Sequence, residues 1–538
     1  MGRILIVGGV AGGASAAARL RRLDENAEII MFERGEHISF ANCGLPYYIG
    51  GEITDKQQLT LQTPKSFRER FNIDVRVLSE IITIDKEVKT VTVKNHQTNE
   101  IYTESYDKLI LSPGAEPIRP SIEGINSDKV FTLHNIPDTF KIKDYIDTNN
   151  SQSAAIVGGG FIGVEMAENL HAIGLKVTLI EMQEQIIPPL DYDMACDVHR
   201  YMKDKGVKLI LKNGVKSIID NGDTLTVKLN EGQVNVDILI MAIGVRPESR
   251  LAKDAGLDIN ERGYIFVNDY MQTSDPDIFA VGDAVGPIPL AGPANKQGRI
   301  VADVLCGGNY RYIGTQGSSV LKVFNMTIAS TGINEKTAKG LGLNYDKSFT
   351  YSPSHATYYP DATYMSIKTI FEKETGKILG AQVVGFSGVD KRCDVFATAI
   401  YAKMTAFDLA RLELCYAPPY SSAKDPVNMA GFVIENLLTS KVHNFHWHDV
   451  DSLPLDAKVT LLDVRSPAEY AGGTIPGFIN IPLDELRSRL GQLDNAKPIY
   501  VTCQVGLRGY IAARILTQNG FETYNLSGGY RLYNSIFS

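Results

Sequence analysis

A single cysteine stands in a glycine- and tyrosine-rich stretch near the start of the chain. Cys43 lies within Ser39–Tyr48, ten residues after Glu33. A dithiol reductase needs a second cysteine close by, but the next cysteine in sequence is Cys196. If Cys43 performs redox chemistry, it therefore acts as a lone thiol, and a substrate supplies its sulfur partner.

A second candidate thiol lies near the other end of the chain. Cys503 follows a short apolar strand and opens the loop Cys503–Gly509, after which a helix is expected over 510–519. Backbone amides that curl around a cysteine at a helix start favour its thiolate. A buried structural cysteine is the commoner case, but Arg508 and the two loop glycines argue against it. We therefore predict a stabilised thiolate at Cys503, with Arg508 beside it.

The elements before Cys43 have the order of a dinucleotide-binding fold. A strand at 3–7 runs into the glycine turn Gly8–Gly13, a helix follows, and a strand at 27–32 ends at Glu33, twenty residues after Gly13. Such glycines let the backbone approach a pyrophosphate, and the acid accepts a hydrogen bond from a ribose hydroxyl. One departure is Val10, which replaces the middle glycine of G-x-G-x-x-G.

A second and complete copy of this motif follows. A strand at 154–157 leads into Gly158–Gly163, and the next strand ends at Glu181, eighteen residues after Gly163. Glu181 would bond a free ribose 2′-hydroxyl and repel a 2′-phosphate. NADH is therefore favoured over NADPH, although a nearby arginine or lysine would still admit the phosphate.

Two dinucleotide folds in one chain indicate a flavin and a nicotinamide in a hydride relay. An apolar strand ends at Gly282 and Asp283, where Asp283 would bond a ribityl hydroxyl, a role compatible with capping a helix. Residues 106–115 and 237–247 each look like a strand followed by a turn. We expect these two matching crossovers to carry the chain out of the first domain and back into it.

Composition limits the class of protein. The chain has 538 residues, 44% of them hydrophobic, and a net charge of −8. This predicts a soluble protein of three or four domains, and the acidic balance argues against a nucleic-acid coat. There is no bilayer-length apolar run and no room for a signal peptide. Six scattered cysteines suit a reducing cytoplasm.

Together the two glycine motifs, Glu33, Ser39–Tyr48 and Gly282-Asp283 resemble the single-cysteine pyridine nucleotide–disulfide oxidoreductases. Val10 and the stretch around Cys43 most resemble the coenzyme A disulfide reductases, over residues 1–436. The resemblance implies FAD, NADH and coenzyme A, with a thiol carried on Cys43. The predicted cofactor contacts are Gly8, Gly9, Val10, Ala11, Gly12, Gly13, Glu33, Arg34, Asn42, Ser112, Pro113, Gly114, Gly158, Gly160, Phe161, Ile162, Gly163, Glu181, Gly244, Gly282 and Asp283.

The same resemblance implies substrate contacts. Arg19 and Arg22 share one helix face, which for most arginine pairs is simply a solvated face. The positions that match coenzyme A contacts of the family are Ser15, Arg19, Arg22, Ser39, Asn42 and Lys424. The family also places two tyrosines of the partner subunit beside the substrate sulfur, where a phenol acts as a general acid. Tyr358 and Tyr416 are the best matches, with Tyr359 and Tyr420 left open as neighbours.

The C-terminal part resembles a rhodanese domain over about 449–538, in which Cys503 would carry a persulfide. A departure is Thr474, where many relatives have histidine. Between the two parts lie His443, His446 and His448. No cysteine or acidic cluster completes a metal site, so we predict no metal and interpret this stretch as a linker.

These observations predict an α/β chain with two Rossmann-like dinucleotide-binding domains, an α+β dimerisation domain and an α/β rhodanese domain. The predicted boundaries are 1–112 with 245–311 for FAD, 113–244 for NADH, 312–440 for dimerisation, 441–452 for the linker and 453–538 for the rhodanese domain. The predicted protein is a cytoplasmic homodimer that reduces coenzyme A disulfide, coenzyme A persulfide or polysulfide and binds neither nucleic acid nor membrane. The alternatives are an NADH oxidase or peroxidase that cycles Cys43 through sulfenic acid, and a sulfur-carrier or redox-sensing protein.

Overall fold

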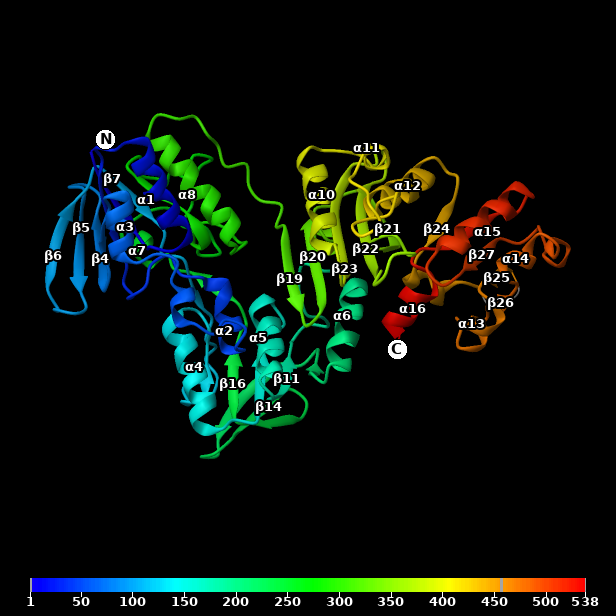
Figure 1. Cartoon of the computed structure of the whole chain (residues 1–538), viewed down its shortest axis with the longest axis horizontal. Helices are drawn as coiled ribbons and strands as arrows, with labels where there is room; N and C mark the ends of the chain where they lie inside the picture. The colour runs from blue at the N-terminus through cyan, green and yellow to red at the C-terminus, as the bar shows by residue number, and fades with distance from the viewer. Residues whose placement is uncertain (1, 455–457, 538) are drawn as a thin grey trace. The chain divides into compact units, whose positions relative to one another are not determined.

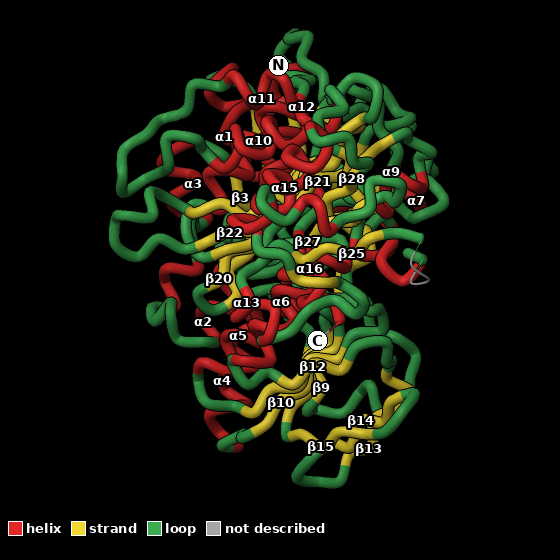
Figure 2. The backbone as a smooth tube through the Cα atoms, turned by 90° about the vertical axis from the view of Figure 1, so that its right-hand side faces the viewer, coloured by secondary structure: helices red, strands yellow, loops and turns green. Residues whose placement is uncertain are grey.

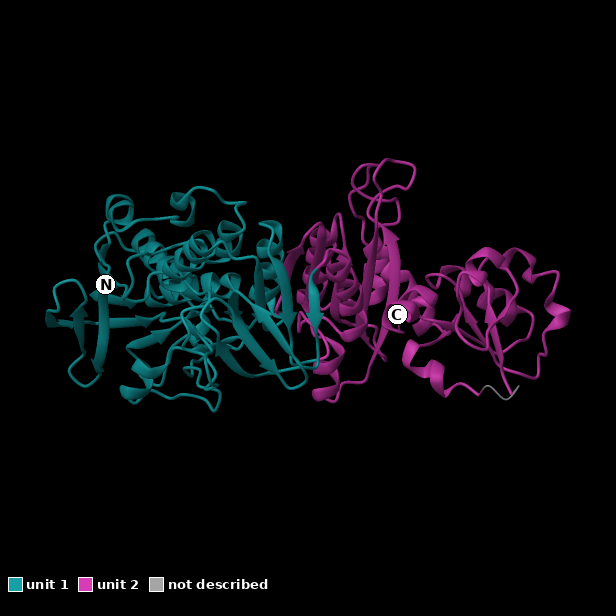
Figure 3. Cartoon of the chain, turned by 90° about the horizontal axis from the view of Figure 1, so that it is seen from below, with its two compact units in different colours: residues 1–183, 207–315 teal, residues 184–206, 316–538 magenta. Residues whose placement is uncertain are grey.

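The structure is a computed structural model that describes residues 2–454 and 458–537. The chain forms two compact units, coloured separately in Figure 3: residues 1–183 with 207–315, and residues 184–206 with 316–538. Within the described residues, no helix has both the length and the apolar character needed to span a bilayer.

The first unit contains two parallel five-stranded sheets. One has the order β18-β7-β1-β2-β3 and the other β12-β11-β10-β16-β9. The strands of the first are β1 (Arg3–Val7), β2 (Glu28–Phe32), β3 (Asp74–Arg76), β7 (Lys108–Leu111) and β18 (Ile278–Ala280). Those of the second are β9 (Val130–Phe131), β10 (Ser153–Val157), β11 (Lys176–Ile180), β12 (Lys208–Ile210) and β16 (Ile238–Met241). The prediction of two Rossmann-like domains is confirmed.

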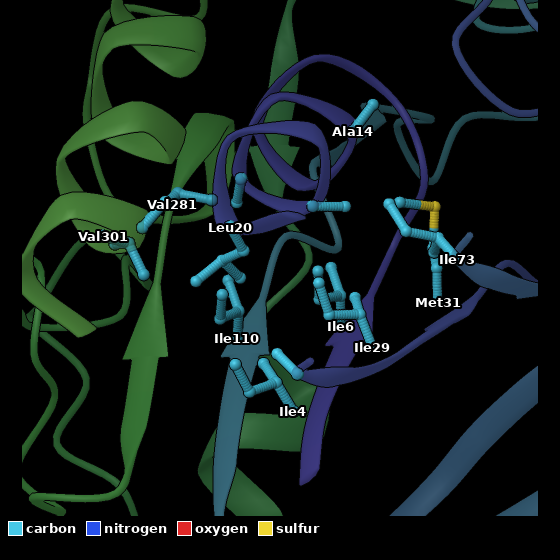
Figure 4. Close-up of a cluster of buried hydrophobic side chains, with 14 of the residues drawn as sticks. Ile4, Ile6, Ala14, Leu20, Ile29, Met31, Ile73, Ile110, Val281 and Val301 are labelled. Atoms are coloured by element: carbon cyan, nitrogen blue, oxygen red, sulfur yellow. The ribbon is translucent and has the colours of Figure 1, made fainter. Parts of the chain in front are cut away.

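Helices cover the faces of these sheets, which is why their strands are nearly continuous apolar runs. Helices α1 (Ala11–Leu23) and α8 (Ala291–Leu305) pack side by side (Figure 1). Figure 4 shows side chains of the core that α1, α8 and the first sheet share, among them Ile4, Ile6, Leu20 and Val301. The other helices of the first unit are α2 (Leu45–Ile49), α3 (Pro64–Phe71), α4 (Ile136–Asn149), α5 (Phe161–Ala172) and α7 (Arg250–Asp254).

Three small antiparallel sheets complete this unit. A meander, β4 (Ser79–Asp85), β5 (Thr90–Asn95) and β6 (Ile101–Ser105), shares a hydrophobic core with the first parallel sheet. A second meander, β13 (Val215–Asp220), β14 (Leu225–Leu229) and β15 (Gln233–Val236), lies at the lower end of Figure 2. The pair β8 (Ala115–Pro117) and β17 (Val245–Pro247) forms at the two predicted crossovers.

The second unit begins with an antiparallel sheet of order β19-β20-β23-β22-β21. Its strands are β19 (Ser319–Val323), β20 (Met326–Gly332), β21 (Tyr345–Pro353), β22 (Tyr364–Glu372) and β23 (Ile378–Gly385). The helices are α6 (Tyr192–Asp204), α9 (Glu335–Gly340), α10 (Val389–Tyr401), α11 (Ala406–Arg411) and α12 (Pro426–Leu438).

Helix α6 groups with this sheet rather than with the NADH half in which the sequence places it. The fully buried Lys368 ammonium of β22 bonds both carboxylate oxygens of Asp193, at 2.8 and 2.9 Å. Ser366 donates a hydrogen bond to Asp197 at 2.9 Å. A buried ammonium must be paired, so these contacts bind α6 to the second unit.

The C-terminal domain is a parallel sheet of order β24-β28-β27-β25-β26. Its strands are β24 (His443–Phe445), β25 (Thr460–Asp463), β26 (Ile479–Asn480), β27 (Ile499–Thr502) and β28 (Thr523–Leu526). Its helices are α13 (Pro467–Ala471), α14 (Leu483–Leu486), α15 (Leu507–Gln518) and α16 (Gly529–Phe537). The predicted linker differs from this structure: residues 443–445 form edge strand β24, because Phe445 is buried in the domain core.

Candidate functional site

A cavity of about 920 Å³ opens in the first unit. Fifteen of the residues predicted to contact a cofactor or substrate line it: Gly8, Val10, Ala11, Gly12, Ser15, Glu33, Arg34, Ser39, Asn42, Cys43, Ser112, Pro113, Gly114, Gly282 and Asp283. Residues from five separate parts of the chain therefore meet at one site.

The glycine turn of this site is fixed by close backbone approaches. Gly8 has φ +91°, and a Cβ there would lie 2.1 Å from the carbonyl oxygen of Ser112. A Cβ on Gly13 would lie 2.0 Å from the oxygen of Gly8. Val10 supplies no side-chain cap to α1. The first amides of α1 therefore suit a pyrophosphate, as a dinucleotide requires.

Glu33 and Glu181, the two acids predicted to bind ribose, each accept a hydrogen bond from a backbone amide of the neighbouring glycine turn. Glu33 accepts the amide of Gly9 at 3.0 Å, and Glu181 accepts the amide of Gly159 at 2.7 Å. Each carboxylate also accepts a second amide two residues further along the chain, at 2.9 and 2.7 Å. The two turns therefore fit two dinucleotides.

The second turn explains the departure at Val10. A Cβ on Gly158 would lie 2.2 Å from the oxygen of Ala242, and one on Gly163 would lie 1.9 Å from Gly158. A Cβ on Gly160, the counterpart of Val10, would meet nothing within 4 Å. The first and last glycines of the motif are sterically required, whereas the middle position has room for a side chain.

Cys43 lies in the short 3₁₀ turn η1 (Asn42–Gly44) and is exposed to the cavity. The surrounding protein still withdraws its sulfur from bulk water. This desolvation, followed by the charges of Glu165 and Asp283, raises the pKa of the Cys43 thiol above its ordinary value. At neutral pH Cys43 is therefore a thiol that must lose its proton before it can attack a disulfide.

Sequence reasoning missed Glu165, which lies on α5 just after the second glycine motif. Burial raises the pKa of Glu165 to about 7. The Tyr47 hydroxyl donates a long hydrogen bond to this carboxyl, at 3.4 Å. The only signal in the sequence was an acid in the first turns of an apolar helix.

The predicted coenzyme A contacts divide into two groups. Ser15, Ser39 and Asn42 line the cavity, whereas Arg19, Arg22 and Lys424 are not among its lining residues. The Arg19 guanidinium is paired with Asp303 of α8 at 2.6 Å. Ser15 donates a hydrogen bond to Asn295 of α8 at 2.5 Å, a partner that sequence reasoning missed.

The second unit brings Tyr358 and Tyr416 together. Their hydroxyls lie 2.8 Å apart. Their side chains are 76% and 47% exposed, so the pair faces solvent in the single chain. The hydrogen bond to Tyr416 raises the pKa of Tyr358. Tyr359 instead packs edge-on against His355, with ring centroids 5.8 Å apart. With its pKa raised, the Tyr358 phenol is protonated at neutral pH.

The loop around Cys503 surrounds its sulfur with backbone amides. The amide of Gly506, at φ +94°, donates to Sγ at 3.1 Å. The amides of Val505 and Gly509 and the charge of Arg508 also favour the thiolate. Burial outweighs them, because Cys503 is 0% exposed, and the pKa of Cys503 is raised. The predicted amide cradle is present and favours the thiolate, but its effect on the pKa is smaller than the opposing effect of burial.

Two ion pairs hold this loop in place. Arg508 makes a bidentate pair with Glu469, at 2.6 and 2.8 Å, which lowers the pKa of Glu469 to about 2. The buried Arg465 pairs with Asp463 at 2.7 Å. Thr474, which departs from the family pattern, donates to Asp463 at 2.9 Å. Thr474 therefore contacts the carboxylate that holds Arg465.

The histidines of the predicted linker have other partners. His446 lies 3.3 Å from Asp346, and His448 lies 3.0 Å from Asp449. Across residues 2–454 and 458–537, no group of three histidine, cysteine or acidic side chains is arranged to hold a metal ion.

The sheets, the paired glycine turns and the cysteine cavity define a flavin- and nicotinamide-dependent oxidoreductase. Residues 2–298 match the model of the pyridine nucleotide-disulphide oxidoreductase family, and 318–426 match its dimerisation domain. Residues 447–535 match the rhodanese-like domain. The chain belongs to the pyridine nucleotide-disulphide oxidoreductase family and has a C-terminal rhodanese-like domain, which confirms the predicted fold class.

Three relatives give the more particular comparison. The coenzyme A disulfide reductase of Staphylococcus epidermidis is 38% identical over 444 residues, which cover 80% of this chain and 99% of the relative. Reduced CoADR-RHD of Bacillus anthracis is 54% identical with a TM-score of 0.97, over 99% of this chain and 98% of that one. A NAD-dependent persulfide reductase from A. fulgidus is 38% identical with a TM-score of 0.92, over 99% and 100%.

Proposed function

We propose that this protein is a FAD-dependent NADH oxidoreductase that reduces coenzyme A disulfide, coenzyme A persulfide or polysulfide through a mixed disulfide between Cys43 and coenzyme A. The observation that supports it most is the cavity itself. Among its lining residues in the described chain, Cys43 is the one cysteine. A dithiol relay has no second sulfur there, so the substrate must supply it.

The chemistry at Cys43 follows from a lone thiol. The Cys43 thiolate attacks one sulfur of coenzyme A disulfide, an S–S bond forms between Cys43 and coenzyme A, and coenzyme A thiolate leaves. With coenzyme A persulfide the same bond forms and hydrosulfide leaves. Bound FAD and NADH would supply the two electrons that cleave the mixed disulfide. Coenzyme A then departs as its thiol after taking up one proton.

Proton supply is the proposed role of the tyrosine pair. The dimerisation domain supports a homodimer, in which Tyr358 and Tyr416 of one subunit serve the Cys43 site of the other. A neutral phenol can protonate the coenzyme A thiolate as it leaves. Arg19, Arg22 and Lys424 supply positive charge suited to the phosphates of coenzyme A.

Cys503 is proposed to handle sulfane sulfur as a persulfide. Amides aimed at its sulfur would stabilise the negative charge of a persulfide, which is more acidic than a thiol. A rhodanese-like domain in the same chain supports a substrate that contains sulfane sulfur. The scattered free cysteines of the whole chain fit a reducing cytoplasm.

The test compares three substrates in one assay. The purified FAD-loaded protein is given coenzyme A disulfide, coenzyme A persulfide or polysulfide, each with NADH and with NADPH, and nucleotide oxidation is followed anaerobically. Intact-protein mass spectrometry should show Cys43 carrying coenzyme A. Glu181 predicts a preference for NADH.

One alternative has a specific observation behind it. A water-forming NADH oxidase from Lactobacillus brevis is 30% identical with a TM-score of 0.78, over 82% of this chain and 99% of that one. An oxidase would consume oxygen rapidly under NADH and show Cys43 only as thiol or sulfenic acid. That result would replace the reductase proposal.

A further inference from the structure

The two tyrosines of the proposed acid pair sit on different loops. Tyr358 lies between β21 and β22, and Tyr416 lies between α11 and α12. Tyr358 is mostly exposed and Tyr416 about half exposed, so packing around the rings contributes little to holding the hydroxyls 2.8 Å apart. The positions of the loop backbones therefore largely set this distance.

One buried side chain bonds both loops. Arg392 of α10 is 1% exposed. Its NH2 group donates to the carbonyl oxygen of Ser354, four residues before Tyr358, at 3.1 Å. The same group donates to the Ser421 hydroxyl at 3.0 Å and to the Tyr420 carbonyl at 3.4 Å, just beyond Tyr416.

Asp425 anchors this guanidinium. Its Oδ2 accepts from Arg392 at 3.0 and 3.2 Å and from the Ser421 hydroxyl at 2.7 Å. Its Oδ1 accepts the amide of Val427 in the first turn of α12. A direct backbone bond from Ala356 to Ser421, at 3.0 Å, lies beside this cluster. The two loops are therefore joined by this backbone bond and, beside it, through one arginine and one carboxylate.

The use of a buried arginine–carboxylate pair indicates that this cluster positions the groups around it as well as stabilising the fold. A buried ion pair gains little over apolar residues of the same size, so stability does not require one here. A guanidinium is planar and offers five donors in fixed directions. It can therefore hold three backbone or side-chain oxygens and a carboxylate at once, which a lysine ammonium cannot do with the same directions.

Building on the acid role proposed above for the tyrosines, we propose that Arg392 is a positioning residue that locks the Tyr358 and Tyr416 loops so that the two hydroxyls meet. Arg392 touches neither hydroxyl and does not take part in the reaction itself. Asp425 orients the Arg392 guanidinium. The Ser421 hydroxyl bonds both side chains and so fixes the Tyr416 loop relative to them.

The test is a double-mutant cycle in the full-length FAD-loaded protein with coenzyme A disulfide as substrate. Arg392→Lys should lower kcat by about 10- to 100-fold, the cost of a small misplacement of catalytic groups. The rate at which NADH bleaches the flavin absorbance should stay within about twofold, because that step does not use the tyrosines. Arg411→Lys, at an exposed arginine of α11, is the matched control and should behave as wild type.

The decisive arm places Arg392→Lys in the Tyr358→Phe/Tyr416→Phe background. If Arg392 acts through the hydroxyls, it causes no further loss there, since residues that act as a unit are not additive. A full additive loss, or an unchanged kcat in Arg392→Lys alone, would overturn the proposal. If Arg392→Lys fails to retain FAD or to fold, Ser421→Ala, which keeps the ion pair, is put through the same cycle and the same two outcomes apply.

Failure of the proposed function gives a different pattern. If Tyr358→Phe/Tyr416→Phe retains wild-type kcat, the tyrosines have no acid role, and the positioning role of Arg392 falls with it. If that double variant is impaired but the Arg392 loss is additive, the tyrosine role stands and only the role of Arg392 is lost.

Discussion

Cys43 and Cys503 are two thiols of one chain in opposite surroundings. Cys43 is exposed to a cavity and has two acids near it, Glu165 and Asp283, that disfavour its thiolate. Cys503 is fully buried, with loop amides and Arg508 that favour its thiolate. Burial raises the pKa of both thiols. The two sites differ because the acids near Cys43 add to this effect, whereas the amides and Arg508 near Cys503 oppose it. An open site suits docking of a bulky thiol, and an amide cradle suits storage of a charged sulfur.

The largest expected effect tests the docking thiol. Cys43→Ser removes the nucleophile, so NADH-driven reduction of coenzyme A disulfide should fall by more than about 10⁴-fold. FAD content, flavin bleaching by NADH and sulfur transfer at Cys503 should be retained. Residual disulfide reduction above one per cent of wild type would show that Cys43 is not the nucleophile.

The second effect tests the storage thiol. Cys503→Ser should lower the transfer of sulfane sulfur by about 100-fold or more while coenzyme A disulfide reduction stays within about twofold. Cys196→Ala is the matched control, because Cys196 is also buried and its pKa is raised to about 12, but it lies far from either loop in sequence. Equal loss of both activities in Cys503→Ser would refute the division of labour.

A smaller effect tests the amide cradle. Gly506 has φ +94°, and alanine in a left-handed conformation costs about 1–2 kcal/mol. Gly506→Ala should therefore lower the stability of the rhodanese domain by that amount and slow persulfide loading at Cys503 by about tenfold. Gly520→Ala, also at positive φ but with open space around its Cβ, controls for backbone strain alone. If both variants load persulfide equally well, the Gly506 amide has no special role.

The smallest effect tests the acids around Cys43. The charge of Glu165 adds to the effect of burial in raising the pKa of Cys43, so Glu165→Gln should lower that pKa. Burial remains, so the value should not return to that of a free thiol. The pH midpoint of iodoacetamide alkylation of Cys43 measures the change, with Glu52→Gln as the control. A midpoint that rises would contradict the assigned cause.

Glu165 should also make the stability of the folded protein depend on pH. Its pKa in the folded protein is raised to about 7, above its unfolded value near 4.3. The unfolded chain therefore loses its proton first, and Glu165 reduces stability as pH rises from about 4 to 7. In Glu165→Gln this loss is absent, so the variant should gain thermal stability over wild type at pH 8 more than at pH 5. An equal change at both pH values would contradict it.

The sequence by itself determined both nucleotide folds, the lone thiol and the C-terminal cradle. Each depends on local order: a strand, a glycine turn, a helix and an acid lie within about 30 residues, as a βαβ unit requires. Gly8 and Gly158 could be read from sequence because the fold leaves no room for a Cβ at either. At Cys503 local order predicts the amides that favour the thiolate, but it does not reveal how strongly burial in the surrounding core opposes them.

Tertiary structure alone decided the contacts between distant segments. Arg19 meets Asp303 across 284 residues, and Arg392 joins two loops that have no common pattern in sequence. The pairing of Tyr358 with Tyr416, rather than with their neighbours, depends on those loops. Such contacts arise because packed elements bring together residues whose sequence separation carries no periodic signal. Local chemistry could therefore be predicted, whereas the placement of the proposed catalytic groups relative to one another could not.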